Sequence, residues 1–219
     1  MRRLGAGKKY MGRLAVLLLA VLPLLGCFPS RKPPVLVKEY VLEYAPPSFE
    51  GRVRIPAEIK VQRFGASRGT DTPQMVFTPG PYERKAYNYH RWMVPPADMV
   101  TDYLTRDLQG SGLLEAVFSW TEAEQARFVL TGGVEKFLEV DAPEGEARKA
   151  VLVVNVTFLD TSRKEIPERV LFQKTYRETR ELRAKSPAGL AGAMSEAMRA
   201  FSKALIQDVY RAARARVEP

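Results

Sequence analysis

Residues 151–158 read Val-Leu-Val-Val-Asn-Val-Thr-Phe, and this run is the strongest strand signal in the chain. Successive side chains in a strand point to opposite faces. One face here carries Leu152, Val154, Val156 and Phe158, and the other carries Val151, Val153, Asn155 and Thr157. Phe128, Leu130 and Val134 alternate in the same way, and residues 170–177 form a third run of β-branched and aromatic residues. Together the three runs predict an antiparallel meander.

A long helix is expected after the meander. Ser186-Pro187 is a good helix start, because the serine hydroxyl can cap the first turn and proline suits the first helical position. The apolar residues behind it recur every three or four positions, at Leu190, Met194, Met198, Phe201, Leu205 and Val209. This spacing predicts one apolar stripe that faces a sheet. Arg211, Arg214 and Arg216 near the far end either suit the negative pole of the helix dipole or form a basic contact patch.

Shorter elements are expected before the meander. They are strands near 38–44 and 59–61, a hairpin over 75–94 interrupted by Pro79-Gly80-Pro81, a helix over 97–109 and a strand near 116–119. Gly132-Gly133 predicts a bulge or a bend in the first strand of the meander. The fold class is therefore α+β: a single domain with an antiparallel sheet and two main helices packed on one face.

The N-terminal segment reads as an export signal. Residues 1–13 contain Arg2, Arg3, Lys8, Lys9 and Arg13 without an acidic residue, and residues 14–25 are apolar apart from one proline. About a dozen apolar residues are too few to span a bilayer stably. Leu24-Leu25-Gly26-Cys27 then resembles the bacterial lipobox, in which a peptidase cuts before the cysteine and the thiol carries diacylglycerol. The alternative is an ordinary signal in which Cys27 is one more apolar residue.

This interpretation divides the chain into a signal over 1–26, a lipidated tether over 27–36 and a domain over 37–219. Cleavage between Gly26 and Cys27 leaves Cys27, the only cysteine, with diacylglyceryl and N-acyl chains that hold it durably in a membrane. The signal contains five of the 34 basic residues and none of the 25 acidic ones, so the mature chain has 29 basic residues and a net charge of +4. Mild basicity in an exported protein argues against a nucleic-acid partner.

The sequence offers no catalytic or metal-binding set. Gly65-Ala66-Ser67-Arg68-Gly69 fits the Gly-x-Ser-x-Gly nucleophile elbow of α/β-hydrolases, which needs a helix straight after the serine and a distant histidine. Thr70-Asp71-Thr72-Pro73 does not favour a helix, and the only histidine, His90, comes too soon after the serine. We therefore expect a loop at 65–69 and no enzymatic activity. With no second histidine and no free thiol, no metal site is expected.

Several features together resemble one family. They are the lipobox, the early strand, the segment from Trp92 to Met99, the helix end from Leu108 to Gly112, the strand at 128–132 and the closing helix. The chain resembles the ABC-type transport auxiliary lipoproteins, the PqiC-like (YmbA-like) group. The resemblance implies a non-enzymatic lipoprotein of the outer membrane, facing the periplasm, which works with an MCE-domain protein and an ABC permease in lipid transport. Phe28 agrees with this location, because an aspartate after the lipidated cysteine commonly marks inner-membrane retention.

A docking surface for such partners is expected among the aromatic residues of the hairpin. Trp92, Tyr87 and Tyr89 are the candidates, because large aromatic side chains dominate interface energetics. The alternative is that they belong to the sheet and the core. Other functions also stay open: a domain that holds lipid itself, an assembly lipoprotein of another machine such as one that handles lipopolysaccharide, and an envelope hydrolase. A homo-oligomer is plausible for a docking component, but no residue decides it.

Overall fold

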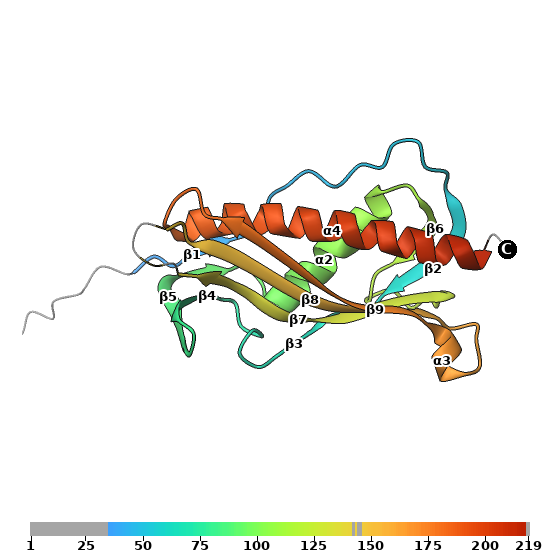
Figure 1. The fold of residues 1–219 in the computed structure, drawn as a ribbon, viewed down its shortest axis with the longest axis horizontal. Coiled ribbons are helices and arrows are strands. Elements are labelled where there is room, and N and C mark those ends of the chain that lie inside the picture. Colours follow the sequence, from blue (N-terminus) through green and yellow to red (C-terminus); the bar gives the residue numbers. More distant parts are fainter. Residues whose placement is uncertain (1–34, 142, 144–145, 218–219) are drawn as a thin grey trace, which may run out of the picture. The chain divides into compact units, whose positions relative to one another are not determined.

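The predicted meander forms the centre of the fold. The computed structural model describes residues 35–141, 143 and 146–217. β7 (Phe128–Val140), β8 (Lys149–Asp160) and β9 (Val170–Glu181) pair in order, each antiparallel to the next (Figure 1). Every second residue of β8 from Ala150 to Phe158 is buried in the main core. The alternation seen in the sequence therefore places one face of β8 against that core, as expected.

The remaining strands make the sheet mixed. They are β1 (Lys38–Tyr40), β2 (Ile55–Val61), β3 (Gly65–Ala66), β4 (Gln74–Gly80), β5 (Glu83–Trp92) and β6 (Leu114–Phe118), so that nine strands of the described residues form one sheet. β4 and β5 form the expected antiparallel hairpin. In contrast, β2, β3 and β4 run parallel to β7, β6 runs parallel to β2, and β1 runs parallel to β5.

The prediction of an antiparallel sheet is therefore correct for the meander and the hairpin and needs correction for the other pairs. The physical reason lies in the connections. Between β2 and β6 the chain passes through the hairpin and the helix α2 (Pro96–Gly110) before it returns to the sheet. A parallel pair requires a long connection of this kind, whereas a tight turn can join only an antiparallel pair.

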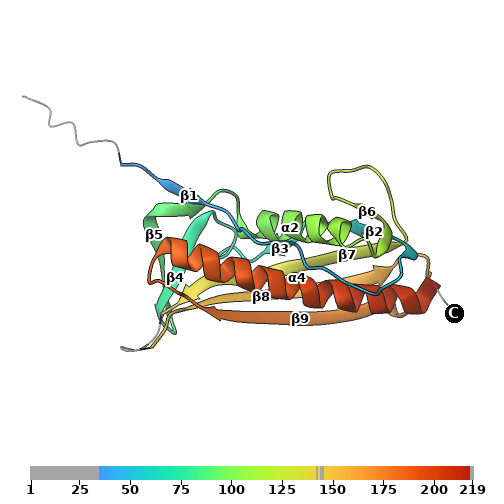
Figure 2. The same cartoon turned by 90° about the horizontal axis from the view of Figure 1, so that it is seen from above.

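The two main helices pack on the sheet and share one core. α4 (Pro187–Val217) begins as predicted, with the Gly189 amide donating to the Ser186 hydroxyl at 3.1 Å. All six residues of its predicted apolar stripe are fully buried, and burial of such a side chain contributes about 1.5–3 kcal/mol. Residues of α2, α4 and β8 belong to the same buried cluster, and Figure 2 shows both helices lying over the strands. A short helix, α3 (Ile166–Arg169), joins β8 to β9 and was not expected.

Gly132 lies where another backbone comes close. A Cβ atom at this position would lie 2.2 Å from the backbone oxygen of Asn155 in β8 and 2.5 Å from the ring of Phe64. The irregularity in the β7–β8 pairing falls later, between Val134 and Lys136. The expected bulge therefore occurs in this strand but is displaced from the two glycines, and Gly132 serves the packing of Phe64 instead.

Residues 41–54, which we call the strap, run alongside α2 and α4 without regular secondary structure (Figure 2). The amide of Glu43 donates to the hydroxyl of Ser195 in α4 at 2.9 Å, and the Tyr210 hydroxyl of α4 donates to the Val53 carbonyl at 2.9 Å. The expected strand over 38–44 thus ends at Tyr40, because the strap makes its hydrogen bonds with helices rather than with a neighbouring strand. Leu42 still points inward and is fully buried, as the alternation predicts.

An arginine held between two tyrosines fastens the strap to α2. The guanidinium of Arg106 lies 4.5 Å from the ring centres of both Tyr44 and Tyr103. Arg106 also donates to the buried carboxylate of Asp107 at 2.8 Å, and the Tyr44 hydroxyl donates to the same carboxylate at 2.8 Å. Burial and the neighbouring Asp107 charge raise the pKa of Tyr44. The tyrosine therefore stays a neutral hydrogen-bond donor and keeps the strap in place.

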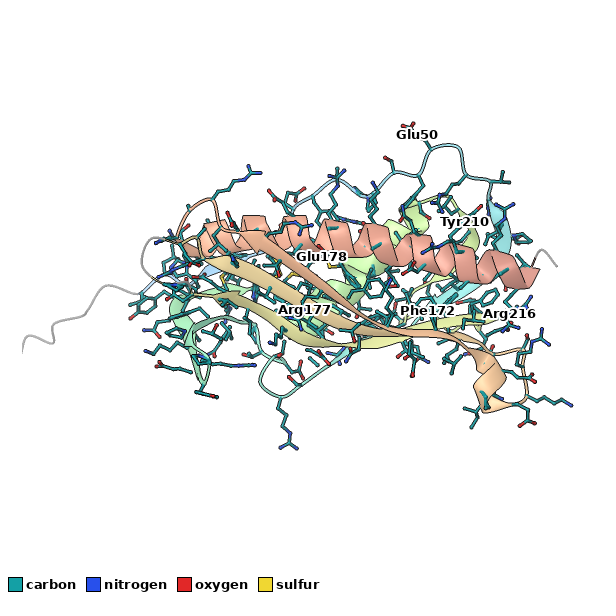
Figure 3. All side chains as sticks on the ribbon, in the orientation of Figure 1. Glu50, Phe172, Arg177, Glu178, Tyr210 and Arg216 are labelled. Atoms are coloured by element: carbon teal, nitrogen blue, oxygen red, sulfur yellow. The ribbon has the colours of Figure 1, made fainter. Side chains whose placement is uncertain are left out.

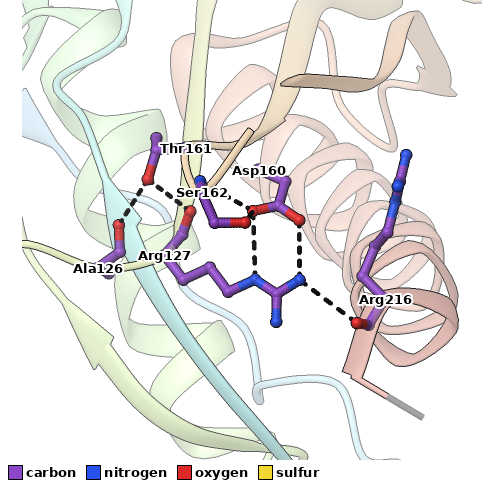
Figure 4. Close-up of polar contacts among 6 residues, drawn as sticks. All are labelled: Ala126, Arg127, Asp160, Thr161, Ser162 and Arg216. Atoms are coloured by element: carbon purple, nitrogen blue, oxygen red, sulfur yellow. Dashed lines mark hydrogen bonds and ion pairs between the residues drawn. The ribbon is translucent and has the colours of Figure 1, made fainter. Parts of the chain in front are cut away.

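A second buried carboxylate connects the meander to the end of α4 (Figure 4). Asp160 has no exposed surface and accepts hydrogen bonds from Arg127 at 2.9 and 3.2 Å and from the Ser162 hydroxyl at 2.6 Å. Arg127 also donates to the carbonyl of Arg216 at 3.3 Å. Burial alone raises the pKa of Asp160, but the hydrogen bonds from Arg127 and Ser162 outweigh it and lower the pKa to about 2.

Candidate functional site

The predicted lipid attachment site, Cys27, and the predicted cleavage position after Gly26 lie outside the described residues. The described residues from Val37 onward form one compact unit. Within the part of the chain that the structure describes, no helix is both long enough and apolar enough to cross a membrane. The predicted partner-binding residues, in contrast, are all described, and the three of them lie in β5.

Trp92, at the end of β5, is a core residue. Its side chain is only 1% exposed, and its ring meets the ring of Phe137 edge-on with 5.1 Å between the centroids. Its indole nitrogen has no hydrogen-bond partner among the described residues. The expectation that Trp92 contacts a partner is corrected accordingly, because a ring enclosed by the core presents no surface. The alternative considered from the sequence, a core position, is the one found.

Tyr87 is half-buried and points toward a third buried carboxylate. Its hydroxyl donates to Glu139 of β7 at 2.9 Å, and Arg148 donates to the other oxygen of that carboxylate at 3.0 Å. Arg148 also pairs with Asp141 at 2.7 Å. Burial and the hydrogen bond to Glu139 raise the pKa of Tyr87 to about 12. Tyr87 thus joins β5 to β7, and its polar end is already occupied.

Tyr89 is the one of the three that lies on the surface, where it is 51% exposed. Lys38 pairs with His90 and Tyr40 pairs with Trp92, so the residues on either side of β1 lie beside those of β5. The exposed apolar residues at this edge are Val37, Val41, Tyr89, Met93 and Val94, which are between 37% and 58% exposed. We call this set the edge surface. Because Tyr40 and Trp92 point inward, the alternating residues Val37, Val41, Tyr89 and Met93 point outward.

The edge surface has the character of an interaction site. An ion pair between Glu39 and Arg91, with 2.6 Å between oxygen and nitrogen, lies among the apolar side chains. Exposed apolar side chains that gather around a few polar groups are typical of surfaces that meet a partner. Val37, Val41, Met93 and Val94 were not predicted from the sequence. A signal for the first three was present, because they alternate with the inward residues Tyr40 and Trp92.

The residues of the hydrolase-like motif are not arranged for catalysis. Gly65 and Ala66 form β3 against β7, so the expected loop includes two strand residues. The Ser67 hydroxyl shares a hydrogen bond with Thr70 at 3.1 Å, and the following residues 67–73 turn toward β4 without a helix. The His90 ring nitrogen Nδ1 instead bonds the hydroxyl of Tyr40 at 2.9 Å. Among the described residues, no three acidic, histidine or cysteine side chains are grouped so that they can hold a metal ion.

Two solved structures of other proteins share this fold. Protein XCC0632 from Xanthomonas campestris superposes with a TM-score of 0.75 at 20% identity, over 84% of this chain and 100% of that one. The hypothetical protein CT253 from Chlamydia trachomatis gives a TM-score of 0.51 at 9% identity, over 74% of this chain and 99% of that one. At these identities the likeness shows the fold alone.

No curated protein matches this chain. A family model does match it, over residues 40–205, and its description is the ABC-type transport auxiliary lipoprotein component. The match begins within β1, includes the edge residues Val41, Tyr89, Met93 and Val94, and extends to Leu205 of α4. It covers well over half of the chain, and so the chain belongs to the ABC-type transport auxiliary lipoprotein family.

Proposed function

We propose that this protein is a non-enzymatic docking component of an MCE/ABC-type lipid transport system. In this proposal diacylglyceryl and N-acyl chains on Cys27 anchor it in the outer membrane, and its domain faces the periplasm. The observation that carries the proposal is the edge surface of the family domain, which lies beside β1, the strand that follows the predicted tether. A partner that docks there contacts the first strand that follows the tether in the sequence.

The polar groups of the domain also support docking rather than catalysis. Three carboxylates are fully buried among the residues that the structure describes, and each binds an arginine and at least one hydroxyl group. They are Asp107, Glu139 and Asp160. Buried charges that are paired in this way hold elements together, and their hydrogen-bonding capacity is already used. The apolar side chains of the edge surface, in contrast, are exposed and can contact a partner.

Affinity capture tests the partner. The tagged full-length protein is extracted from crosslinked membranes in mild detergent, and the co-purified proteins are identified by mass spectrometry. We expect an MCE-domain protein and an ABC permease. Recovery of lipopolysaccharide-assembly components instead would point to the other machine considered above. If no envelope protein is enriched over an untagged control, the docking proposal fails.

A matched pair of variants tests the surface. Tyr89→Ala combined with Met93→Ser removes exposed apolar area at the edge and should reduce capture of the MCE-domain protein by about tenfold. Tyr82→Ala is the control, because Tyr82 is a fully exposed tyrosine at the turn between β4 and β5, outside the edge surface. Equal capture by both variants would show that the partner binds elsewhere.

The anchor is tested separately. Radiolabelled palmitate should enter the wild-type protein and not the Cys27→Ala variant, and label in both would contradict lipidation at Cys27. Separation of inner and outer membranes on a density gradient then tests the location. The proposed location predicts that the wild-type protein is found in the outer-membrane fraction.

A further inference from the structure

A basic pocket lies at the C-terminal end of α4. Residues of the strap form its other wall, although they are far from α4 in the sequence. Its volume is about 560 Å³, and its lining includes Arg52 and Val53 of the strap together with Tyr210, Arg211 and Arg214 of α4. None of the lining residues that the structure describes is acidic. Figure 3 shows Tyr210 near this end of the helix and Glu50 on the outer side of the strap. The pocket therefore combines three guanidinium groups in one hollow.

Arg52 is held in place by aromatic rings rather than by a carboxylate. Its guanidinium carbon lies 5.2 Å from the ring centre of Tyr210 and 6.0 Å from that of Phe49. Among the described residues it makes no hydrogen bond and no ion pair, and these two ring contacts are its only specific interactions. Stacking uses the face of a guanidinium and leaves the N–H groups at its edge able to donate. Arg52 is thus oriented but keeps its donors for a ligand.

The carboxylate that pairs with Arg211 does not neutralise the pocket. Asp208 pairs with Arg211, but it also accepts hydrogen bonds from Lys174 at 2.6 Å and from the Tyr176 hydroxyl at 2.7 Å. One negative charge is therefore shared between two cations and a hydroxyl group. Arg52 adds a further positive charge, so among the described residues the three cations Lys174, Arg211 and Arg52 exceed the single charge of Asp208. This excess outweighs the helix dipole, which places only about half a negative charge at the C-terminal end of a helix.

The chemical groups that line the pocket indicate which anion it can bind. A guanidinium donates two parallel hydrogen bonds to the oxygens of a phosphate or a carboxylate, and several arginines around one hollow suit a group with three or four oxygens. The Val53 carbonyl, which would repel an anion, already accepts the Tyr210 hydroxyl at 2.9 Å. The Tyr210 ring, Val53 and Ala215 supply an apolar wall for the organic part of an ester.

We propose that this pocket binds the phosphate group of a phosphate ester. Two sources share this chemistry: the head group of an anionic phospholipid and a soluble phosphate ester. The proposal goes beyond the docking function, because it concerns a different face of the domain and does not depend on the identity of the protein partner. The pocket also gives a role to Arg211 and Arg214. From the sequence alone, these arginines could either complement the helix dipole or form a basic contact patch.

Calorimetric titration of the full-length lipoprotein in a nonionic detergent tests the proposal. The probes are inorganic phosphate, glycerol 3-phosphate, dihexanoyl phosphatidylglycerol and an acidic hexapeptide of glutamates. We expect saturable binding of glycerol 3-phosphate and of the short-chain lipid, weakened by added salt. Tighter binding of the lipid identifies a lipid head group as the ligand, and equal binding identifies the soluble ester. Saturation by the acidic peptide alone, or by none of the probes, overturns the proposal.

Variants test whether the probes bind at this pocket. Arg52→Gln combined with Arg214→Gln should weaken binding of the short-chain lipid by about tenfold or more, since hydrogen bonds between charged groups are lost. Arg52→Lys keeps the charge and loses the planar fork, and an intermediate affinity is expected. Arg68→Gln is the control, because Arg68 is an exposed arginine in the loop after β3. A double variant that melts at the wild-type temperature and binds as the wild type does would place the phosphate elsewhere.

Discussion

Replacement of Asp160 by asparagine should destabilise the protein at neutral pH and have much less effect in acid. Asp160 joins β8 to Arg127, and through Arg127 to the last turn of α4. The substitution keeps the size of the side chain and removes its charge. Any effect that depends on pH can therefore be assigned to the ionised carboxylate rather than to a cavity.

The pKa of Asp160 gives the expected magnitude. Its pKa falls from 3.8 to about 2 in the folded protein. One pKa unit corresponds to about 1.4 kcal/mol, so the ionised carboxylate contributes about 2 kcal/mol to the free energy of unfolding. Because the folded pKa lies below the unfolded one, this contribution is complete above about pH 5. It is lost as the pH falls through the interval between 3.8 and about 2.

Urea unfolding followed by circular dichroism, for wild type and Asp160→Asn from pH 7 to pH 2, measures this contribution. We expect a difference in unfolding free energy of about 2 kcal/mol at pH 7, or roughly 4–8 °C in Tm for a domain of this size. The difference should shrink below about pH 4, because the unfolded wild type then takes up a proton on Asp160, and it should be smallest near pH 2, where the folded carboxylate is also protonated. A difference that stays constant from pH 7 to pH 2 would refute the argument, since it could not come from ionisation of Asp160.

Two further predictions concern packing, and thermal melts test both. Gly132→Ala should destabilise the domain by about 2 kcal/mol or more, because the added methyl group overlaps a backbone oxygen. Gly133→Ala is the control and should be nearly neutral, because its Cβ would lie 3.7 Å from the nearest atom. Trp92→Ala should cost about 3–5 kcal/mol, whereas Tyr89→Ala should leave the melting temperature within a few degrees of wild type. Similar melting temperatures for the last two variants would contradict the assignment of one residue to the core and the other to the surface.

The periodic parts of the fold could be predicted from the sequence. The apolar residues from Leu190 to Val209 repeat at helical spacing, and those along residues 151–158 repeat at every second position. The structure buries the faces that these two spacings predict. The parallel pairs could not be predicted, because register between distant strands depends on contacts that leave no local pattern. The pairing of β2 with β6, for example, joins segments with a hairpin and a helix between them.

The candidate site was predictable only in part. Tyr89 and Trp92 are three residues apart in one strand, so they point to opposite faces and could not both contact a partner from one surface. The sequence alone does not say which face meets the core, since both faces of β5 carry aromatic residues. In the structure Trp92 packs against Phe137, so the face of β5 that carries Trp92 is the one that meets the core. The position of Arg52 over Tyr210 was equally hidden, because more than 150 residues separate the two.

The strap also determines how the domain carries a mechanical load. A pull on Val37 along the chain first strains the short parallel pairing of β1 with β5, and such a pairing resists as a unit in shear rather than opening one bond at a time. Behind it, the hydrogen bonds of Glu43 to Ser195 and of Tyr44 to Asp107 pass the remaining force to α4 and α2. A pull on the N-terminal end of the domain therefore loads the two longest helices before it reaches the central strands β7 and β8.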